Sequence, residues 1–441
     1  MLKWSKRRAH QFFYLALFSL FVLFSLLHNQ SASRLHGGMQ KEDSATRSSF
    51  PTYLTTNSSI HKSSRVLGDS EWAKACGSSR SYKRKLRRST RYQQPRRNRQ
   101  EKCDIFAGRW VYDTVSYPLY DEGGCPYMSD QLACTKHGRP DVEYQRMRWQ
   151  PHGCNLKRWN GSDMLEKLRD KRLMFVGDSL NRGQWISMVC LLQSMLPSGK
   201  KSMSPNAPLT IFTAEEYNAT VEFYWAPLIV ESNSDDPVNH RLDYRIIRPN
   251  SLFKHASQWK NADILVFNSY LWWRSGPKIK LLWNADDEIC EEADGLDAMA
   301  LALETWADWI SSSVNPLKQR VFFVTMSPTH LWSREWNPGT EGNCFKEKSP
   351  INIESYWGSG SDLSTMKMVD SILSKVDYRV TVLNITQLSE YRKDGHPSIY
   401  RKFWETFSPQ QLENPASYAD CIHWCLPGVP DVWNELLFNL L

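Results

Sequence analysis

A strand-to-helix turn at residues 171–185 (KRLMFVGDSLNRGQW) limits the possible folds of this chain more than any other stretch. Four apolar residues run into Gly177, and Asp178 and Ser179 then precede a segment with a helical pattern to about residue 196. A short apolar run that meets a small residue and continues as a helix is typical of a strand–turn–helix unit. A serine at such a turn stands at the carboxyl end of a strand, beside the backbone N–H groups of a helix start. A nucleophile finds both room and anion stabilisation there.

The tripeptide Gly-Asp-Ser alone is a weak signal, because these residues are common in turns. It also occurs at residues 68–70, where only Val66 and Leu67 precede it in a polar segment and no buried strand is expected. The apolar run before Gly177 therefore makes Ser179 the candidate nucleophile. Asp178 is expected to cap the following helix rather than to take part in catalysis.

Charge divides the chain at about residue 102. Residues 1–102 hold 21 of the 55 Lys and Arg residues but only 5 of the 47 acidic ones, so the rest of the 441-residue chain is mildly acidic. Residues 1–11 are basic, and residues 12–27 are 16 consecutive uncharged residues. This pattern predicts a cytosolic tail at 1–11 and an uncleaved transmembrane signal anchor at 12–27, with the bulk of the chain in a lumen. A signal peptide cleaved near residues 31–33 is the alternative.

Residues 28–102 are rich in Ser, Arg and Lys with little apolar periodicity, which predicts a disordered basic stem. Residues 80–99 contain ten basic residues and no acidic one. Such a run can attract an acidic polysaccharide. Nucleic acid is not an expected partner, because the chain enters a lumen.

Cysteines and glycosylation sequons fit the same compartment. Nine of the ten cysteines lie at or beyond residue 103, so disulfides are expected. Four of the nine lie in the loop-rich, aromatic segment 103–159, which we expect to be a Cys-rich, disulfide-stapled N-terminal subdomain packed on the domain C-terminal to it. The candidate glycosylation sites are Asn57, Asn160, Asn218 and Asn384.

Residues 160–441 show apolar strands alternating with helical segments. This alternation predicts an α/β three-layer sandwich with a mostly parallel central sheet covered on both faces. Active sites in such sheets lie beyond the carboxyl ends of the strands, where Ser179 and Asn268 are expected. The expected strands are 172–176, 220–230, 262–267, 320–326 and 378–385, and the expected helices are 164–169, 180–196, 296–314 and 363–376.

The sequence DCIHWC at 420–425 supplies a candidate acid and base. Asp420 and His423 are three residues apart, so their side chains can meet on one helical turn or in a tight loop. A carboxylate on one imidazole nitrogen fixes the tautomer and leaves the other nitrogen to take a proton from a serine. Cys421 and Cys425 flank the pair and could fix it by disulfides. A zinc site using both thiolates, and a purely structural Asp–His pair, are the alternatives.

The order Ser179, Asp420, His423 resembles the plant trichome-birefringence-like (TBL) family of polysaccharide O-acetyltransferases, whose fold is similar to that of the GDSL/SGNH hydrolases. The resemblance covers the chain from residue 103 onward. The sequences NSYLWW, RKDGHPSIY and ENPASYADCIHWCLPG are most similar to those of the xylan-acetylating branch. Gly183 departs from the family, in which asparagine is common at that position. The motifs that carry the resemblance are GRWVYD (108–113), YPLY (117–120), GRPD (138–141), RWQPHGC (148–154), VGDSLNR (176–182), NSYLWW (268–273), SPTH (327–330), NITQLSEYRKDGHPSIY (384–400) and DCIHWCLPG (420–428).

The resemblance implies an enzyme that acetylates wall polysaccharide, with xylose O-2 or O-3 of xylan as the acceptor. Ser179 would be the nucleophile, His423 the general base and Asp420 its orienting carboxylate. The enzyme would be a single-pass type II protein of the Golgi membrane, with its catalytic domain in the lumen and no bound metal. The family pattern also implies the disulfides Cys103–Cys154, Cys125–Cys190, Cys134–Cys425 and Cys344–Cys421.

Transfer requires an acetyl donor, either acetyl-CoA or a relayed acetyl carrier, and no permanently bound cofactor is expected. Nothing in the sequence resembles a CoA-binding motif. The backbone N–H of Ser179 and the side-chain amide of Asn268 are candidate oxyanion donors, and Gly177 is a weaker one. Arg182 either pairs with Asp178 or contacts the substrate.

His330 and His396 are expected to be structural. The chain has 19 tryptophans, and indole faces can stack on sugar rings, although most of these side chains are expected in the core. A Ser-His-Asp triad serves hydrolysis as well as transfer. The alternatives are therefore an acetyl esterase of wall polysaccharides, an acetyltransferase for xyloglucan, mannan or pectin, and a polysaccharide-binding protein with a vestigial triad.

Overall fold

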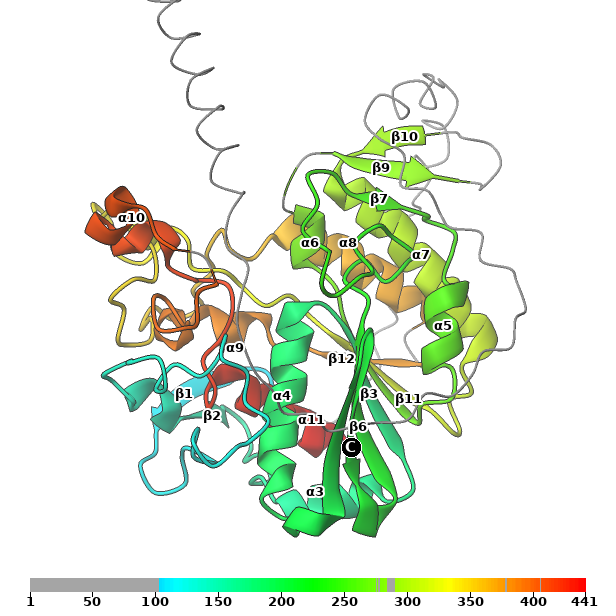
Figure 1. Ribbon diagram of the computed structural model, residues 1–441, viewed down its shortest axis with the longest axis horizontal. Helices are drawn as coiled ribbons and strands as arrows, with labels where there is room; N and C mark the ends of the chain where they lie inside the picture. Colours follow the sequence, from blue (N-terminus) through cyan, green and yellow to red (C-terminus); the bar gives the residue numbers. More distant parts are fainter. Residues whose placement is uncertain (1–102, 275, 277, 284–289, 377–378, 405) are drawn as a thin grey trace, which may run out of the picture. The chain divides into compact units, whose positions relative to one another are not determined.

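The computed structural model describes residues 103–441, apart from 275, 277, 284–289, 377–378 and 405 (Figure 1). The expected cytosolic tail, anchor and stem, together with Asn57, lie outside the described residues. Within the described part of the chain, no helix has the length and apolar character needed to cross a membrane.

A seven-stranded mixed sheet forms the centre of the molecule, in the order β12-β11-β8-β3-β6-β5-β4. Five neighbouring strands, β12 to β6 in that order, are parallel, as the sequence predicts, and β5 and β4 continue the sheet as an antiparallel hairpin. The strands are β3 (Arg172–Gly177), β4 (Lys201–Asn206), β5 (Leu209–Ala214), β6 (Ala219–Trp225), β8 (Ile264–Asn268), β11 (Arg320–Val324) and β12 (Val380–Leu383).

The β4–β5 hairpin is absent from the expected strands. Of the six residues of β4, only Met203 is large and apolar, and most of the strand is exposed. An edge strand that buries little has no apolar alternation to reveal it. The expected strand 220–230 ends at Trp225, and the chain beyond it turns over the sheet end, where Ala226 N donates to Gly177 O at 3.0 Å.

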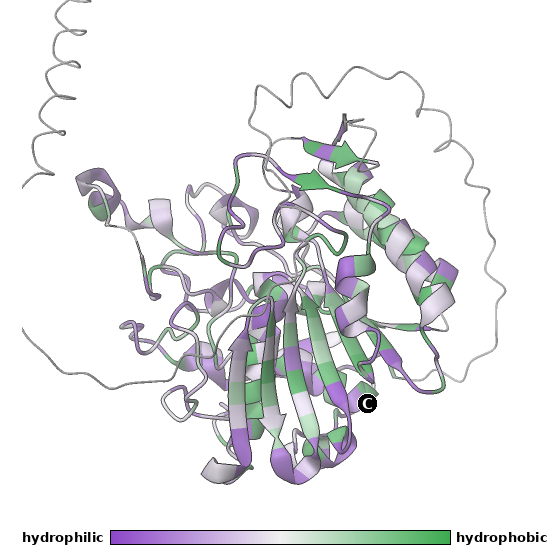
Figure 2. Cartoon of the chain, turned by 45° about the vertical axis from the view of Figure 1, so that its right-hand side comes forward, coloured by the Kyte–Doolittle hydropathy of each residue, from purple (hydrophilic) through white to green (hydrophobic). Residues whose placement is uncertain are grey.

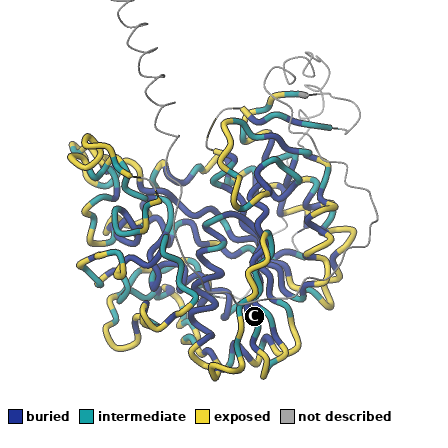
Figure 3. The backbone as a smooth tube through the Cα atoms, in the orientation of Figure 1, coloured by how far each residue is buried: buried dark blue, intermediate teal, exposed yellow. Residues whose placement is uncertain are grey.

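Helices cover both faces of the sheet (Figure 1). Alternate strand residues such as Phe175 and Phe223 pack with α3 (Gly161–Leu168), α4 (Ser179–Gln193) and α11 (Val429–Leu440). Their neighbours Met174 and Val176 pack on the other face with α5 (Phe253–Trp259), α7 (Gly295–Ser313) and α8 (Leu363–Leu373). The three-layer α/β sandwich expected from the alternating pattern is therefore present. Figure 2 shows the apolar residues running along the strands, and Figure 3 shows the buried backbone at the centre.

Shorter elements surround the sandwich. Two small sheets pair β1 (Gly108–Tyr112) with β2 (Met147–Pro151), and β9 (Ile279–Leu282) with both β10 (Cys290–Ala293) and β7 (Ile246–Ile247). The remaining α-helices are α6 (Leu271–Arg274), α9 (Thr386–Glu390) and α10 (Pro409–Glu413). Short 3-10 helices lie at Glu143–Arg146, Ser198–Lys200, Glu215–Tyr217, Ser333–Glu335, Ser374–Val376, Lys393–Gly395 and Pro415–Tyr418.

Residues 103–159 pack directly on the sandwich. Trp149, Cys125 and Leu132 belong to the same buried cluster as α4 and α11. The structure contains the same four disulfides that the family pattern implies: Cys103–Cys154, Cys125–Cys190, Cys134–Cys425 and Cys344–Cys421. Only the first lies within the N-terminal segment, while the second and third attach that segment to α4 and to the loop before α11. The disulfides therefore fix this segment to its neighbours more than they staple it internally.

Candidate active site

The turn between β3 and α4 places Ser179 at the carboxyl edge of the sheet. Asp178 caps the helix as predicted, because its Oδ1 accepts a hydrogen bond from Leu180 N at 2.9 Å. Gly177 lies between neighbouring strands, and a Cβ at this position would be 2.1 Å from the carbonyl oxygen of Asn268. Only a glycine permits this close approach, so the residue before Asp178 is dictated by packing.

Ser179, His423 and Asp420 form a continuous hydrogen-bonded chain. The Ser179 Oγ lies 2.8 Å from His423 Nε2, and His423 Nδ1 lies 2.8 Å from Asp420 Oδ2. With the Nδ1 proton donated to the carboxylate, Nε2 is left unprotonated and faces the serine hydroxyl. This arrangement allows the imidazole to remove the serine proton during attack on a carbonyl carbon.

The backbone around Asp420 holds the carboxylate in place. Its Oδ1 accepts hydrogen bonds from Ile422 N at 3.1 Å and His423 N at 3.0 Å, so a tight turn brings acid and base together. Burial by itself would raise the pKa of Asp420. The charge of His423 and its hydrogen bonds outweigh burial and hold the pKa of Asp420 well below its usual range. The carboxylate is therefore ionised at neutral pH and can stabilise the imidazolium that forms during reaction.

Two disulfides fix the histidine turn from either side. Cys421 is joined to Cys344, and Cys425 is joined to Cys134 in the N-terminal segment. Because both sulfur atoms are used in disulfides, neither is a thiolate that could bind a metal. This finding removes the zinc alternative at residues 420–425, and the described residues contain no other group of three or more His, Cys, Asp or Glu side chains placed to hold a metal.

A second pair of histidines supports the backbone of His423. The His396 Nδ1 lies 2.6 Å from the carbonyl oxygen of His423, and its Nε2 lies 2.6 Å from His330 Nδ1. Both rings are buried, and His396 stacks on Trp424 with ring centroids 4.1 Å apart. Burial lowers the pKa of His330 to about 4. These histidines have structural contacts, in line with the expectation, and the contacts reach the backbone of the candidate base.

Comparison with known proteins identifies the family. Residues 156–440 match the family model PC-Esterase, described as a GDSL/SGNH-like acyl-esterase family found in Pmr5 and Cas1p, and residues 101–155 match the PMR5 N-terminal domain. The chain is 68% identical to Protein trichome birefringence-like 35 of Arabidopsis thaliana over 344 residues, which are 78% of this chain and 76% of that protein. It is 52% identical to Probable xylan O-acetyltransferase 10 of Oryza sativa subsp. japonica, over 77% of this chain and 78% of the rice protein. The chain belongs to the TBL family.

Xylan O-acetyltransferase 14 of Oryza sativa subsp. japonica is a further relative of this TBL protein. The two are 49% identical over 362 residues, which cover 76% of each chain. The resemblance inferred from the short motifs is thus confirmed, and so is the GDSL/SGNH-like character of the domain that holds Ser179.

Asn268 in this TBL protein lies at the end of β8, the strand beside β3. Its side-chain Nδ2 donates to the carbonyl oxygens of Val324 at 3.1 Å and Thr325 at 3.2 Å, so the side chain ties neighbouring strand ends together. The oxyanion role of Asn268, and that of the backbone N–H groups of Ser179 and Gly177, stay predictions.

Arg182 does not pair with Asp178, which was one of its two expected roles. Its Nη2 donates to Gln131 Oε1 at 3.0 Å, and the Gln131 Nε2 lies 3.4 and 3.5 Å from the two ring nitrogens of His423. Arg401 approaches the triad from another loop, with its Nε 3.5 Å from Asp420 Oδ2. Sequence reasoning missed Gln131 and Arg401, because a single polar residue in a loop gives no periodic or motif signal.

The other predicted surface sites are accessible. Asn160, Asn218 and Asn384 are all exposed, so each sequon can be reached in the folded chain, and glycosylation of each stays a prediction. Asn160 also caps α3 through its Oδ1, which accepts from Asp163 N at 3.0 Å.

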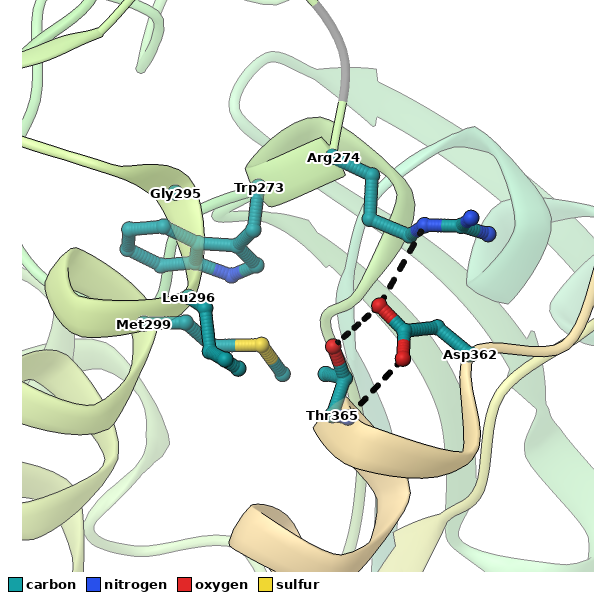
Figure 4. A pocket seen from close by; sticks show the side chains of 7 residues that line it. All are labelled: Trp273, Arg274, Gly295, Leu296, Met299, Asp362 and Thr365. Atoms are coloured by element: carbon teal, nitrogen blue, oxygen red, sulfur yellow. Dashed lines mark hydrogen bonds and ion pairs between the residues drawn. The ribbon is translucent and has the colours of Figure 1, made fainter.

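Two cavities lie beside α7 and α8 and are lined by none of the triad residues. One, of about 230 Å³, is lined by Trp273, Arg274 and Asp362 among others (Figure 4). The other, of about 360 Å³, is mostly apolar and opens near the ends of β8, β11 and β12. The candidate active site is therefore identified by the hydrogen bonds of the triad at the carboxyl edge of the sheet, and neither cavity contains it.

Proposed function

We propose that this TBL protein is an O-acetyltransferase that moves an acetyl group to xylose hydroxyls, O-2 or O-3, of xylan. The hydrogen-bonded chain Ser179–His423–Asp420 is the observation that carries the proposal. Of the rice relatives, one is named Xylan O-acetyltransferase 14 and another Probable xylan O-acetyltransferase 10, and these names support xylan as the acceptor.

The reaction has two acyl transfers. His423 Nε2 takes the hydroxyl proton of Ser179 as Oγ attacks the acetyl carbonyl of the donor, and the imidazolium returns that proton to the leaving group. This step forms an acetyl-serine. A xylose hydroxyl then gives its proton to His423 as its oxygen attacks the acetyl-serine. The imidazolium reprotonates Ser179 Oγ, which leaves as the new ester forms.

The proposal includes an acetyl donor and a place in the cell. The donor is acetyl-CoA or a relayed acetyl carrier, and the protein is anchored in the Golgi membrane by residues 12–27 with its catalytic domain in the lumen. A compartment that supports disulfide formation fits the two disulfides beside His423.

An acetyl esterase is the second candidate, because the matching family model is described as acyl-esterase and the same triad activates water. Transfer requires the sugar hydroxyl to compete with water for the acetyl-serine. The two functions differ in product, since transfer adds acetyl to the sugar and hydrolysis releases acetate.

The test uses the full chain, produced in a secretory host with its disulfides formed and purified in detergent. It is incubated with acetyl-CoA or 4-nitrophenyl acetate and unacetylated xylo-oligosaccharides, and product mass is followed. Ser179→Ala and His423→Ala are expected to lower kcat by on the order of 10⁴ or more. Ser194→Ala, at the exposed serine directly after α4, is the matched control and is expected to keep full activity.

Gain of one acetyl mass by the wild type and by Ser194→Ala alone supports transfer through the triad. Acetate release from acetylated xylan without acetylated product moves the assignment to the esterase. A folded wild-type protein that is silent in both assays rejects the proposal.

A further inference from the structure

Three arginines from separate segments converge on the candidate triad. Arg182 lies on α4, three residues after Ser179, and donates to Gln131 beside His423. Arg401 lies next to Asp420, and Arg241 lies in the segment between β6 and β7. Arg241 directly follows His240, whose ring lies 4.9 Å from that of Trp225, and Trp225 pairs with Gly177 beside Ser179, so all three cations belong to the same end of the sheet.

These arginines have few acidic partners. In the described part of the chain, no carboxylate lies within 4.0 Å of Arg182 or Arg241. Arg401 has only Asp420, whose near oxygen is already bonded to His423, and the buried Arg401 Nε makes no hydrogen bond. Burial lowers the pKa of Arg182 and of Arg401, which reflects the cost of keeping these charges away from water.

Two buried arginines elsewhere in the fold, Arg139 and Arg392, show which contacts a structural cation makes here. Arg139 pairs with Asp141 at 2.9 Å, and Arg392 pairs with Asp394 at 2.9 Å. Each also donates to backbone carbonyls. A cation that is partly removed from water is costly unless it is paired and hydrogen-bonded. Arg182 is partly buried and has only a neutral hydrogen-bond partner, and Arg401 shares its one carboxylate with His423, so we read both as cations that receive a further negative charge from a ligand.

Aromatic side chains lie beside the same cations. The ring of His240 lies 4.9 Å from that of Trp225 and 5.4 Å from that of Trp272, and the Arg401 guanidinium lies 4.4 Å over Phe403. Trp225 ends β6 and pairs with Gly177, so this aromatic group stands at the strand end next to Ser179. Flat rings beside guanidinium groups suit a sugar or base ring that carries an acidic group.

We propose that Arg182, Arg241 and Arg401 form a binding site for an oxyanion, a carboxylate or a phosphate, carried by one of the two reactants that meet at Ser179. The inference rests on the proposed acetyl transfer. The oxyanion is either a uronic acid on the acceptor chain or a phosphate of the acetyl donor. In both cases the arginines hold the reactant by charge-assisted hydrogen bonds while its reacting group reaches Ser179 or the acetyl-serine.

Arg241→Gln is the test variant, because Arg241 is exposed and contacts none of the triad residues by hydrogen bond or ion pair. Lys171→Gln is its matched control. It removes one exposed positive charge at the opposite end of β3, the strand that leads to Ser179. Donors with and without phosphate (acetyl-CoA and 4-nitrophenyl acetate) are crossed with xylo-oligosaccharides with and without one uronic acid, and KM is measured for each.

Arg241→Gln is expected to raise KM about tenfold for the charged reactant that uses the site and to leave KM for neutral reactants unchanged. A rise with acetyl-CoA alone identifies the donor phosphate, and a rise with the acidic oligosaccharide alone identifies the acceptor carboxylate. The proposal is overturned if Arg241→Gln leaves KM for every charged reactant at the wild-type value, or if Lys171→Gln raises KM by the same factor.

A binding measurement separates this inference from the proposed activity. Calorimetric titration of Ser179→Ala protein, with and without Arg241→Gln, follows binding of acetyl-CoA and of the acidic and neutral oligosaccharides with no turnover. Arg241-dependent binding of a charged ligand, together with a wild-type protein that shows no transferase activity, supports the site while the proposed function fails. No Arg241-dependent binding alongside normal transfer rejects the site and leaves the function in place.

Discussion

Glu435 on α11 is expected to make the protein less stable as pH rises. Its side chain is buried with Asp431, one helical turn away, and Tyr117 donates its hydroxyl proton to Glu435 Oε2. Burial raises the pKa of Glu435 from its ordinary 4.5 to about 7, with the charge of Asp431 adding to the rise and the Tyr117 hydrogen bond opposing it. Between about pH 4.5 and 7, Glu435 is therefore protonated in the folded protein and ionised in the unfolded chain.

The sign and size of the effect come from this difference in pKa. The folded state binds more protons than the unfolded state between about pH 4.5 and 7, so the free energy of unfolding falls as pH rises through this range. The two pKa values of Glu435 differ by about 2.5, and each pH unit corresponds to about 1.36 kcal/mol, so the loss approaches about 3 kcal/mol above pH 7. Glu435→Gln keeps an acceptor for Tyr117 but has no proton to lose.

Urea unfolding of the disulfide-intact protein at pH 4 and pH 8 measures the effect. Relative to the wild type, Glu435→Gln is expected to reduce the fall in unfolding free energy between these pH values by about 3 kcal/mol. Glu413→Gln, at an exposed glutamate that ends α10, is the control and is expected to behave as the wild type does. A Glu435→Gln curve parallel to that of the wild type would show that Glu435 is ionised in the folded protein, and the reasoning would be wrong.

Three further changes test other parts of the structure. Asp420→Asn is expected to lower kcat about 10⁴-fold with little change in KM, because an amide cannot hold His423 in the reactive tautomer; steady-state kinetics with no such loss would contradict the triad. Trp433→Ala, at a fully buried indole of α11, is expected to reduce the unfolding free energy by about 3–5 kcal/mol in urea titration, and a change below about 1 kcal/mol would contradict the packing described. Removing the Cys344–Cys421 disulfide with two serines is expected to lower kcat at a temperature where circular dichroism still shows a folded protein, and unchanged kcat would show that the turn holds its shape unaided.

The chemistry of the site can be predicted from the sequence where it depends on local geometry. Ser179 stands at a turn that an apolar strand and a helix define, and Asp420 and His423 meet because one tight turn spans them. Gln131 could not be predicted, because it meets His423 across 292 residues of sequence, and the nearby Cys134–Cys425 disulfide spans 291. No local pattern encodes that distance. Arg401 could not be predicted either, because it reaches Asp420 from a loop that carries no motif or periodic pattern.

The fold shows the same division between local and long-range information. The five parallel strands are apolar runs buried on both faces, which a sequence reveals directly. The expected helices do not include α11, although its polar residues Asp431, Asn434 and Glu435 recur at helical spacing. That spacing does not reveal that the polar side is buried. In the structure all three are buried and hydrogen-bonded, two of them to Ser187 of α4 and one to Tyr117.

The disulfide between Cys134 and Cys425 creates an ordering problem during synthesis. A ribosome adds about 5–20 residues each second, so roughly 15–60 s separate the appearance of the two cysteines. Cys154, Cys190, Cys290, Cys344 and Cys421 emerge in between. Cys134 must therefore stay reduced through that interval or exchange a wrong partner for the right one. Production of the folded protein should then depend on a disulfide isomerase as well as on an oxidising compartment. In a host that oxidises thiols but reshuffles them poorly, the chain would accumulate with its candidate base misplaced.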